Sequence, residues 1–236
     1  MSSSKGPLYV QVFDDLYKKI VEGVYPIGSF LPTEVALQEK YSVSRVTIRN
    51  AVEQLQLAGL VKKNSGIGTI IISDKKTIDL KKITSFSQEN TDESSILLNF
   101  GLVDPEPKIK IQLNLNTNQL AYELIRIRCV NDKKIGLHKA YIPENRITLT
   151  KKDFELPTSS LYKMFEDEGI TIAWATETIE AMLSTEKLED ILDLSSISSI
   201  LYTERITYNT KNMPIEFVKM YYRGDCYKYS VELNNF

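Results

Sequence analysis

The stretch Ser44-Arg45-Val46-Thr47-Ile48-Arg49-Asn50 decides the fold of the first part of this 236-residue chain. Ser44 is a favoured N-cap and Gly59 a favoured C-terminal stop, so the two residues bound a predicted helix. Apolar residues at i, i+3, i+4 and i+7 give this helix one buried face: Ile48, Ala51, Val52 and Leu55. Its basic and hydroxyl side chains gather in the first turns, which is typical of a helix that enters the major groove of DNA. An ordinary amphipathic helix with a solvated basic face shows the same pattern.

The composition is that of a globular protein, with 42% hydrophobic and 25% charged residues. The length allows one large domain or two smaller ones. No apolar run is long enough to span a bilayer, and the N-terminus has no secretory signal, so we expect a cytoplasmic protein without a membrane partner. Two cysteines and one histidine favour neither a disulfide framework nor a metal site, and no cofactor is predicted.

The net charge of −2 is unevenly distributed along the chain. Residues 1–76 contain 10 Lys and Arg against 7 Asp and Glu, whereas the remainder contains 19 against 24. A mildly basic first part on an acidic body suits a nucleic-acid partner for the first part, although small imbalances of this size also arise by chance.

The first part of the chain has the element order of a winged helix. A four-residue apolar repeat predicts a helix over about 8–22, and Thr33 caps a second helix that ends near Tyr41. The tight connection at 42–44 leads into the third helix, so the pattern is helix, turn, helix. After Gly59 the pattern changes to two short strands around a Gly-rich turn at 65–68.

The order and spacing of five short motifs in residues 7–73 resemble the winged-helix domain of the GntR family of bacterial transcription regulators. These motifs are Leu8-Tyr9-x-Gln11, Gly28-x-x-Leu31-Pro32-Thr33-Glu34, Val43-Ser44-Arg45-x-Thr47-x-Arg49-x-Ala51, Leu55-x-x-x-Gly59-Leu60-Val61 and Gly66-x-Gly68-Thr69. The resemblance implies operator DNA as a partner, with contacts from Thr33, Ser44, Arg45, Thr47, Arg49 and Gly68.

Two positions depart from the pattern of this family. Val35 stands where the family usually has arginine, and Ile67 stands where it often has a basic residue between the wing glycines. Each change removes a contact to phosphate or to the minor groove. We therefore expect Arg45 and Arg49 to supply more of the DNA contact than in a typical relative.

The remainder of the chain has an antiparallel α+β pattern. A polar linker over 74–82 separates a first domain at 1–73 from a second at 83–236. Strands are predicted by alternation of apolar and polar residues or by apolar runs, and helices by caps and helical periods. We expect strands near 109–115, 123–130, 135–142, 171–183, 200–208 and 214–222, and helices after Ser85 or Ser87, at 157–169 and at 188–192.

Several motifs in this second part resemble the UTRA effector-binding domain of the HutC-type branch of the GntR family. They are Thr84-Ser85-Phe86, Arg126-x-Arg128, Ala140-Tyr141-Ile142-Pro143, Ser160-Leu161-Tyr162, Pro214-Ile215-Glu216 and Tyr222-Arg223-Gly224-Asp225-x-Tyr227. The resemblance implies a chorismate lyase-like antiparallel sheet with flanking helices. One departure is Asn114–Ala121, where the family normally has a short helix that here is nearly absent.

Arg126 and Arg128 lie two residues apart on a predicted strand, so both side chains leave the same face. Two guanidinium groups on one face suit a phosphate or a carboxylate, and the predicted helix starts near Ser87 and Ser160 add backbone N–H groups. Glu216 and Tyr222 share one face of the last strand. The resemblance to members that sense sugar phosphates assigns the phosphate to Phe86, Ser87, Arg126, Arg128 and Ser160. It assigns the rest of the ligand to Tyr162, Glu216 and Tyr222.

Some of these assignments have a plain structural alternative. His138 stands where the sugar-phosphate-sensing members often carry glutamate, and it is either a ligand contact or a packing residue. Tyr162 and Tyr222 are equally well explained as core aromatics, and Glu216 as a member of a structural ion pair. Arg223 and Asp225 are better explained as structural, because Gly224 between them marks a tight corner.

The leading hypothesis is a homodimeric repressor that leaves its palindromic operator when a small anionic effector binds. One competing hypothesis is a lyase-like enzyme fused to a DNA-binding domain, but the sequence shows no nucleophile–base–acid set, so we expect no enzyme. The other is a DNA-binding protein whose second domain only dimerises, for which an apolar plug in place of a pocket is the expected sign.

Overall fold

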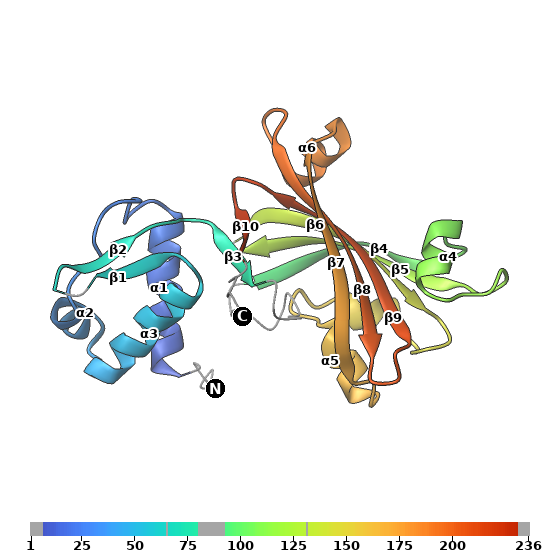
Figure 1. Ribbon diagram of the computed structural model, residues 1–236, viewed down its shortest axis with the longest axis horizontal. Helices are drawn as coiled ribbons and strands as arrows, with labels where there is room; N and C mark the ends of the chain where they lie inside the picture. Colours follow the sequence, from blue (N-terminus) through green and yellow to red (C-terminus); the bar gives the residue numbers. More distant parts are fainter. Residues whose placement is uncertain (1–6, 65, 80–92, 131, 231–236) are drawn as a thin grey trace, which may run out of the picture. The chain divides into compact units, whose positions relative to one another are not determined.

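The computed structural model describes residues 7–64, 66–79, 93–130 and 132–230 (Figure 1). The chain divides into two compact units. One consists of residues 1–81 together with 226–236, and the other of residues 82–225. Each is described by itself below.

Three helices form the body of the first unit: α1 (Leu8–Val21), α2 (Glu34–Tyr41) and α3 (Arg45–Leu57). The short turn between α2 and α3 includes Ser42, whose φ of 53° ends α2 in the left-handed region. Apolar side chains from all three helices are almost completely buried, among them Leu16, Ile20, Leu37, Ile48, Ala51 and Leu55. The apolar stripe predicted for α3 therefore faces the core, as expected.

A two-stranded wing follows α3. β1 (Val61–Asn64) pairs antiparallel with β2 (Gly68–Ile71), so that Val61 lies opposite Ile71 and Asn64 opposite Gly68. Phe30, which precedes α2, adds an isolated antiparallel bridge to Ile70. This arrangement confirms the predicted winged helix.

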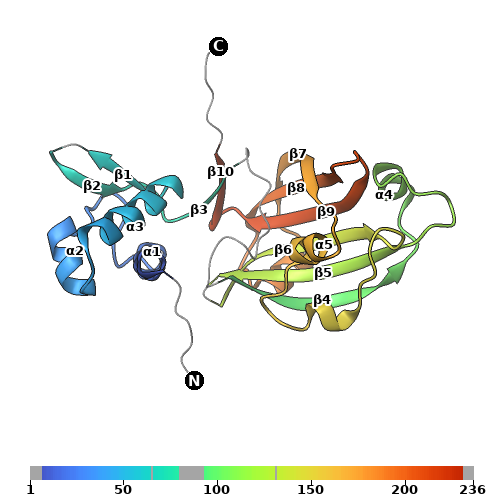
Figure 2. The same cartoon turned by 90° about the horizontal axis from the view of Figure 1, so that it is seen from below.

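A second pair of strands brings together two segments that are far apart in the sequence (Figures 1 and 2). β3 (Lys76–Asp79) lies in the segment predicted as a linker, and it pairs in parallel with β10 (Tyr227–Ser230). The Lys228 ammonium donates to the backbone carbonyl of Gly59 at 3.0 Å, which anchors the C-terminal strand just beyond α3. No local sequence pattern predicts this pair, because its two strands are far apart in sequence.

Six strands form the antiparallel sheet of the second unit, in the order β4-β5-β6-β9-β8-β7 (Figure 2). Their bounds are β4 Glu93–Val103, β5 Ala121–Val130, β6 Lys133–Pro143, β7 Ile172–Leu183, β8 Ser199–Asn209 and β9 Pro214–Arg223. The predicted antiparallel sheet with flanking helices is thus confirmed.

The two faces of the sheet are covered differently. Helices α4 (Pro107–Gln112) and α6 (Glu186–Leu192) cover an apolar face, with Leu188 and Leu192 of α6 packed in a cluster with Ile127, Cys129 and Leu137. On the other face lies α5 (Leu161–Asp167), preceded by the short 3₁₀ helix η2 (Lys151–Phe154). This second face carries buried polar side chains: Arg126, Arg128, His138, Thr203, Arg205, Thr207 and Glu216.

Two predictions about the second unit are wrong. The residues around 109–115 form α4 instead of a strand, because Pro107 starts a helix and Ile109 and Leu113, four residues apart, are both fully buried. Ile111, which a strand would bury with them, is 75% exposed. The short helix ahead of the Arg-x-Arg strand is therefore present, but it lies before Asn114–Ala121 instead of within it.

The helix predicted after Ser85 or Ser87 falls largely outside the described residues. The end of that stretch, from Glu93 onward, belongs to strand β4. None of the described helices is long and apolar enough to cross a membrane.

Candidate functional site

Hydroxyl groups cap helices α2 and α3 of the first unit. The Thr33 hydroxyl accepts from the Ala36 N–H at 3.2 Å, and the Ser44 hydroxyl accepts from the Thr47 N–H at the same distance. The Ser44 and Thr47 hydroxyls also lie 2.9 Å apart. Both predicted N-caps are therefore confirmed, and the first turn of α3 presents hydroxyls beside the positive end of the helix dipole.

The two arginines of α3 are exposed and point to one carboxylate. Arg45 and Arg49 have side chains 64% and 50% exposed, and the Nε of each lies 3.0 and 3.2 Å from Glu34 Oε2. Lys63, on strand β1 of the wing, lies 3.4 Å from Glu34 Oε1. Burial disfavours the charged carboxylate, but the hydrogen bonds from Arg45 and Arg49 outweigh this effect and keep the pKa of Glu34 below its ordinary value.

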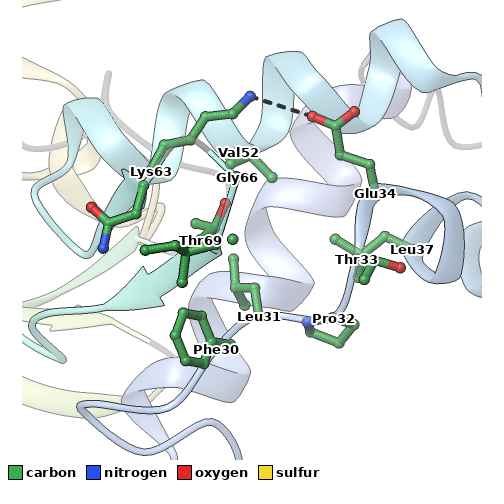
Figure 3. A pocket seen from close by; sticks show the side chains of 13 residues that line it. Phe30, Leu31, Pro32, Thr33, Glu34, Leu37, Val52, Lys63, Gly66 and Thr69 are labelled. Carbon is green, nitrogen blue, oxygen red and sulfur yellow. Dashed lines mark hydrogen bonds and ion pairs between the residues drawn. The ribbon is translucent and has the colours of Figure 1, made fainter.

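A groove of about 470 Å³ runs between the start of α2 and the wing (Figure 3). Gly68 lines it with a φ of +131°, and a Cβ at this position would lie 3.3 Å from the Phe30 ring. A side chain at position 68 is therefore strained and crowded. Val35 and Ile67, which depart from the family pattern, are 62% and 70% exposed. Ile67 lines the groove, and Val35 follows the lining residue Glu34 in sequence.

In the second unit, Arg126 and Arg128 of β5 are both buried, with 4% and 6% exposure. Arg126 donates to the backbone carbonyl of Ser159 at 3.1 Å and lies over the Phe154 ring. No carboxylate of the described residues forms an ion pair with it. Burial and the positive charge of Arg128 both lower the pKa of Arg126 well below its ordinary value, which is the electrostatic condition that a bound anion relieves.

Arg128 starts a chain of hydrogen bonds across the sheet. Its Nε donates to His138 Nδ1 at 3.1 Å, and its Nη1 donates to the Ser95 hydroxyl at 2.6 Å. Burial and the nearby guanidinium groups of Arg128 and Arg126 hold the pKa of His138 well below its ordinary value, so the ring is neutral. Because Nδ1 accepts, the proton is on Nε2, which lies 2.8 Å from the Tyr222 hydroxyl and donates to it.

These hydrogen bonds help to distinguish the two interpretations of His138. Both ring nitrogens are engaged by protein groups, and the ring lies edge-on to Tyr222 with centroids 5.1 Å apart. His138 thus orients the Arg128 guanidinium from within the protein. Direct contact of His138 with a ligand stays a prediction.

Glu216 forms a second polar cluster on the same face. It accepts from the Tyr162 hydroxyl of α5 and from the Thr207 hydroxyl of β8, each at 3.0 Å. Burial raises the pKa of Glu216 above its ordinary value, although Arg205 and these hydroxyls oppose the effect. Burial likewise raises the pKa of Tyr162. A carboxyl group of this kind can exchange hydrogen bonds with the hydroxyls of a small polar ligand.

Strand pairing explains how these residues meet. Arg126 lies opposite His138, His138 opposite Met220 and Met220 opposite Thr203, so one row of side chains crosses four strands. Directly opposite residues in an antiparallel pair project from the same face. The sheet register thus brings most of the described candidate residues to one face.

Two charged residues on this face, Arg205 and Glu177, were not among the residues predicted from the sequence. Arg205 donates through Nε and Nη2 to Glu177 Oε2, at 2.9 and 2.8 Å, and Glu177 lies on the edge strand β7. The alternation of Thr203, Arg205 and Thr207 along 200–208 could have indicated a polar face. Without the register of the strands, however, neither the burial of Arg205 nor its partner is visible.

The remaining predicted residues divide into three groups. Ser160 caps α5 as expected, with its hydroxyl accepting from the Lys163 N–H at 3.3 Å. Phe86 and Ser87 lie outside the described residues. Arg223 binds Asp225 through two nitrogens, at 3.0 and 2.8 Å, and also donates to two backbone carbonyls, which supports the structural explanation for this pair.

Comparison with known protein families shows which family has both this winged helix and this sheet domain. The family described as "UTRA domain" matches residues 88–228, which is more than half of the chain, and "Bacterial regulatory proteins, gntR family" matches residues 8–71. The chain belongs to the GntR family. The resemblance inferred from its sequence motifs is confirmed, with a UTRA domain following the GntR winged helix.

Two relatives extend over nearly the whole length of this GntR-family chain. It is 27% identical over 229 residues to the HTH-type transcriptional repressor NagR of Bacillus subtilis, covering 94% of this chain and 93% of the relative. It is 26% identical over 230 residues to the mannosyl-D-glycerate transport/metabolism system repressor MngR of Escherichia coli, covering 95% of each. Both relatives are named as repressors, and the GntR-family chain is a transcription regulator, not an enzyme.

Solved structures show the same fold. PhnF from Mycobacterium smegmatis matches with a TM-score of 0.64 and 20% identity, covering 95% of this chain and 100% of that one. The possible transcriptional regulator YydK from Bacillus subtilis matches with a TM-score of 0.58 and 21% identity, covering 97% and 100%. At this identity the likeness concerns the fold alone.

Proposed function

We propose that this GntR-family regulator is a repressor that binds a palindromic operator as a homodimer and leaves it when a small anionic effector binds. The effector we propose is a sugar phosphate. The observation that carries the proposal is the buried guanidinium of Arg126, which lies beside Arg128 and forms no ion pair within the described residues. Burying such a charge is costly unless an anion compensates it, so the site is suited to a ligand with a phosphate or carboxylate group.

The operator contacts are proposed for the starts of α2 and α3 and for the wing. The first turn of α3 combines hydroxyls, two arginines and the positive end of a helix dipole, which together suit phosphates and the acceptor edge of guanine. The backbone at Gly68 is free of a side chain and can approach a phosphate closely. The proposed contact residues are Thr33, Ser44, Arg45, Thr47, Arg49 and Gly68.

The effector is proposed to bind on the polar face of the sheet. Arg126, Arg128 and Ser160, with Phe86 and Ser87, are assigned to its phosphate. Tyr162, Glu216 and Tyr222 are assigned to its hydroxyl groups, and His138 lies beside them. The name of MngR refers to a mannosyl-D-glycerate system, which supports a sugar-derived ligand.

The proposal of a homodimer is supported by the geometry of a palindromic operator. Two recognition helices read two half-sites about one helical turn apart when the protein has two-fold symmetry. The alternative of a DNA-binding protein without a ligand predicts an apolar plug. The face covered by α5 instead buries three arginines, a histidine and a glutamate, which is unfavourable for a purely structural core.

Two measurements test this proposal with the full-length protein. The first is selection of duplexes from a randomised pool, with the mass of the complex measured by light scattering. We expect an enriched palindrome bound by two chains. The second is thermal melting with hexose 6-phosphates, inorganic phosphate and the corresponding neutral sugars.

We expect at least one phosphorylated compound to raise the melting temperature while its neutral sugar does not. Absence of an enriched sequence would contradict the operator assignment. A broad panel of phosphates without any effect on melting would contradict the sugar-phosphate effector.

A further inference from the structure

Glu34 contacts three cations that come from two other elements of the winged helix. It is the first residue of α2, and its carboxylate meets Arg45 and Arg49 of α3 and Lys63 of the wing strand β1. Figure 3 shows Glu34 and Lys63 joined at the groove beside the wing. Glu34 is therefore the point at which the helix-turn-helix and the wing are linked by charge.

The two arginines use only one nitrogen each for this contact. Arg45 donates through Nε at 3.0 Å, and Arg49 donates through Nε at 3.2 and 3.4 Å to the two carboxylate oxygens. Within the described residues, the terminal nitrogens of both guanidinium groups make no hydrogen bond. These terminal nitrogens are the donors with which arginine binds guanine or a phosphate in a bidentate manner.

The shared carboxylate counteracts two effects that disfavour DNA binding by these arginines. Arg45 and Arg49 are four residues apart on one helix, where like charges repel. Each long side chain also loses conformational freedom when DNA fixes it. A shared carboxylate offsets the repulsion and restricts both side chains before DNA arrives, while the first turn of α2 favours a negative charge at position 34.

We propose that Glu34 is a positioning residue for operator recognition: it holds Arg45 and Arg49 by their Nε atoms and leaves their terminal nitrogens directed at the DNA. Glu34 thereby increases the preference for the operator over other DNA. It has less effect on the affinity for DNA of any sequence. Non-specific binding depends on phosphate contacts that tolerate many arginine positions, whereas base recognition needs a fixed fork. This inference rests on the proposed operator contacts of Arg45 and Arg49.

The test compares Glu34→Gln with Glu39→Gln in the full-length protein. Glu39 is exposed on the same helix and forms no ion pair within the described residues, so both variants remove one negative charge from the first unit. The probes are the duplex enriched by the wild-type protein from a randomised pool and a shuffled duplex of the same composition. The ratio of the two dissociation constants measures preference.

We expect both variants to bind the shuffled duplex alike and slightly better than the wild type does. Only Glu34→Gln should lose preference for the enriched duplex, by about fivefold or more, with an unchanged melting temperature. NMR without DNA supplies an independent signature, because the Nε–H signals of Arg45 and Arg49 should be protected from water exchange in the wild type and in Glu39→Gln. In Glu34→Gln they should be lost. If Glu34→Gln melts early, Glu34→Asp, with its shorter carboxylate, is expected to give an intermediate preference.

Three results would overturn the inference. Equal preference in the Glu34→Gln and Glu39→Gln variants would make Glu34 an ordinary surface ion-pair residue. A loss confined to a single base pair would make it a direct reader of that base. If the wild type enriches no duplex at all, the proposed operator binding fails, and the role of Glu34 fails with it.

Discussion

At the scale of single residues, two buried arginines on the same sheet face should respond in opposite ways to the same substitution. Arg205 is paired with Glu177 at 2.8 Å, whereas Arg126 forms no ion pair within the described residues. Removing one partner of a buried pair leaves the other charge uncompensated, but removing an uncompensated charge relieves a cost. Arg126→Met should therefore leave the free energy of unfolding unchanged or increase it, and Arg205→Met should lower it by about 3 kcal/mol.

Chemical denaturation of the ligand-free protein measures both values, with each variant serving as the control of the other. Arg126→Met should also lose any stabilisation by sugar phosphates. If Arg126→Met were as destabilising as Arg205→Met, Arg126 would be a structural residue instead of a ligand group.

His138 should make stability depend on pH in a defined direction. Burial and the nearby guanidinium groups of Arg128, Arg126 and Arg205 lower the pKa of His138, so the folded protein keeps the ring neutral while the unfolded chain binds a proton below about pH 6.5. Stability should then fall as the pH drops below 6.5, by up to about 1.4 kcal/mol per pH unit. Glu216 has the opposite sign, because its pKa is raised and its contribution declines as the pH rises above about 4.5.

The contribution of His138 is isolated by comparison with His138→Gln. The difference in unfolding free energy between wild type and variant should shrink progressively from pH 7 to pH 5. Parallel pH curves for the two proteins would mean that His138 is not held neutral by its surroundings.

Arg49 belongs to the proposed operator surface and should affect DNA binding alone. Arg49→Ala is expected to weaken binding of the enriched duplex by about 1–3 kcal/mol without changing the melting temperature or the response to phosphates. The matched control is Lys187→Ala, which removes one exposed positive charge from α6 in the other unit. Full retention of operator affinity by Arg49→Ala, measured by fluorescence anisotropy, would contradict the assignment of α3 as the recognition helix.

At the scale of elements, we expect the apolar side chains Val35 of α2 and Ile67 of the wing to limit the number of phosphate contacts. Both are well exposed and lie in a region otherwise rich in cations. Val35→Arg and Ile67→Lys should each raise DNA affinity and steepen its dependence on salt by about one unit of logarithmic slope. Titrations between low and high salt check this, and unchanged slopes would place these positions away from the DNA.

The elements also show what the sequence allowed us to predict. Helix α3 was predictable because its cap, its apolar stripe and its stop all agree. Helix α4 was not, since Ile109, Ile111 and Leu113 fit an alternating strand as well as Ile109 and Leu113 fit a helix, and only burial separates the two. The parallel pair of β3 and β10 depends on contacts between distant parts of the chain, which no local pattern records.

The same distinction holds for the candidate site. Arg126 and Arg128 were found because a two-residue spacing places them on one face of their own strand. The pair of Arg205 and Glu177 joins two strands, so it depends on a register that becomes visible only in the folded sheet.

At the scale of the whole molecule, we propose that DNA binding belongs to one unit and effector binding to the other. The two activities are coupled only if the effector prefers the arrangement that cannot bind the operator. By reciprocity, operator DNA must then weaken effector binding by the same factor. An effector that binds both arrangements equally would stabilise the protein without releasing DNA.

The most direct test of effector-controlled operator binding is a titration of the operator complex with hexose 6-phosphates and their neutral sugars, using the wild type and Arg126→Met. We predict that one phosphorylated sugar releases the wild-type protein from the enriched duplex, that its neutral counterpart does not, and that Arg126→Met stays bound throughout. Release of Arg126→Met at the same concentration as the wild type, or equal release by the neutral sugar, would contradict an effector held by the buried arginines.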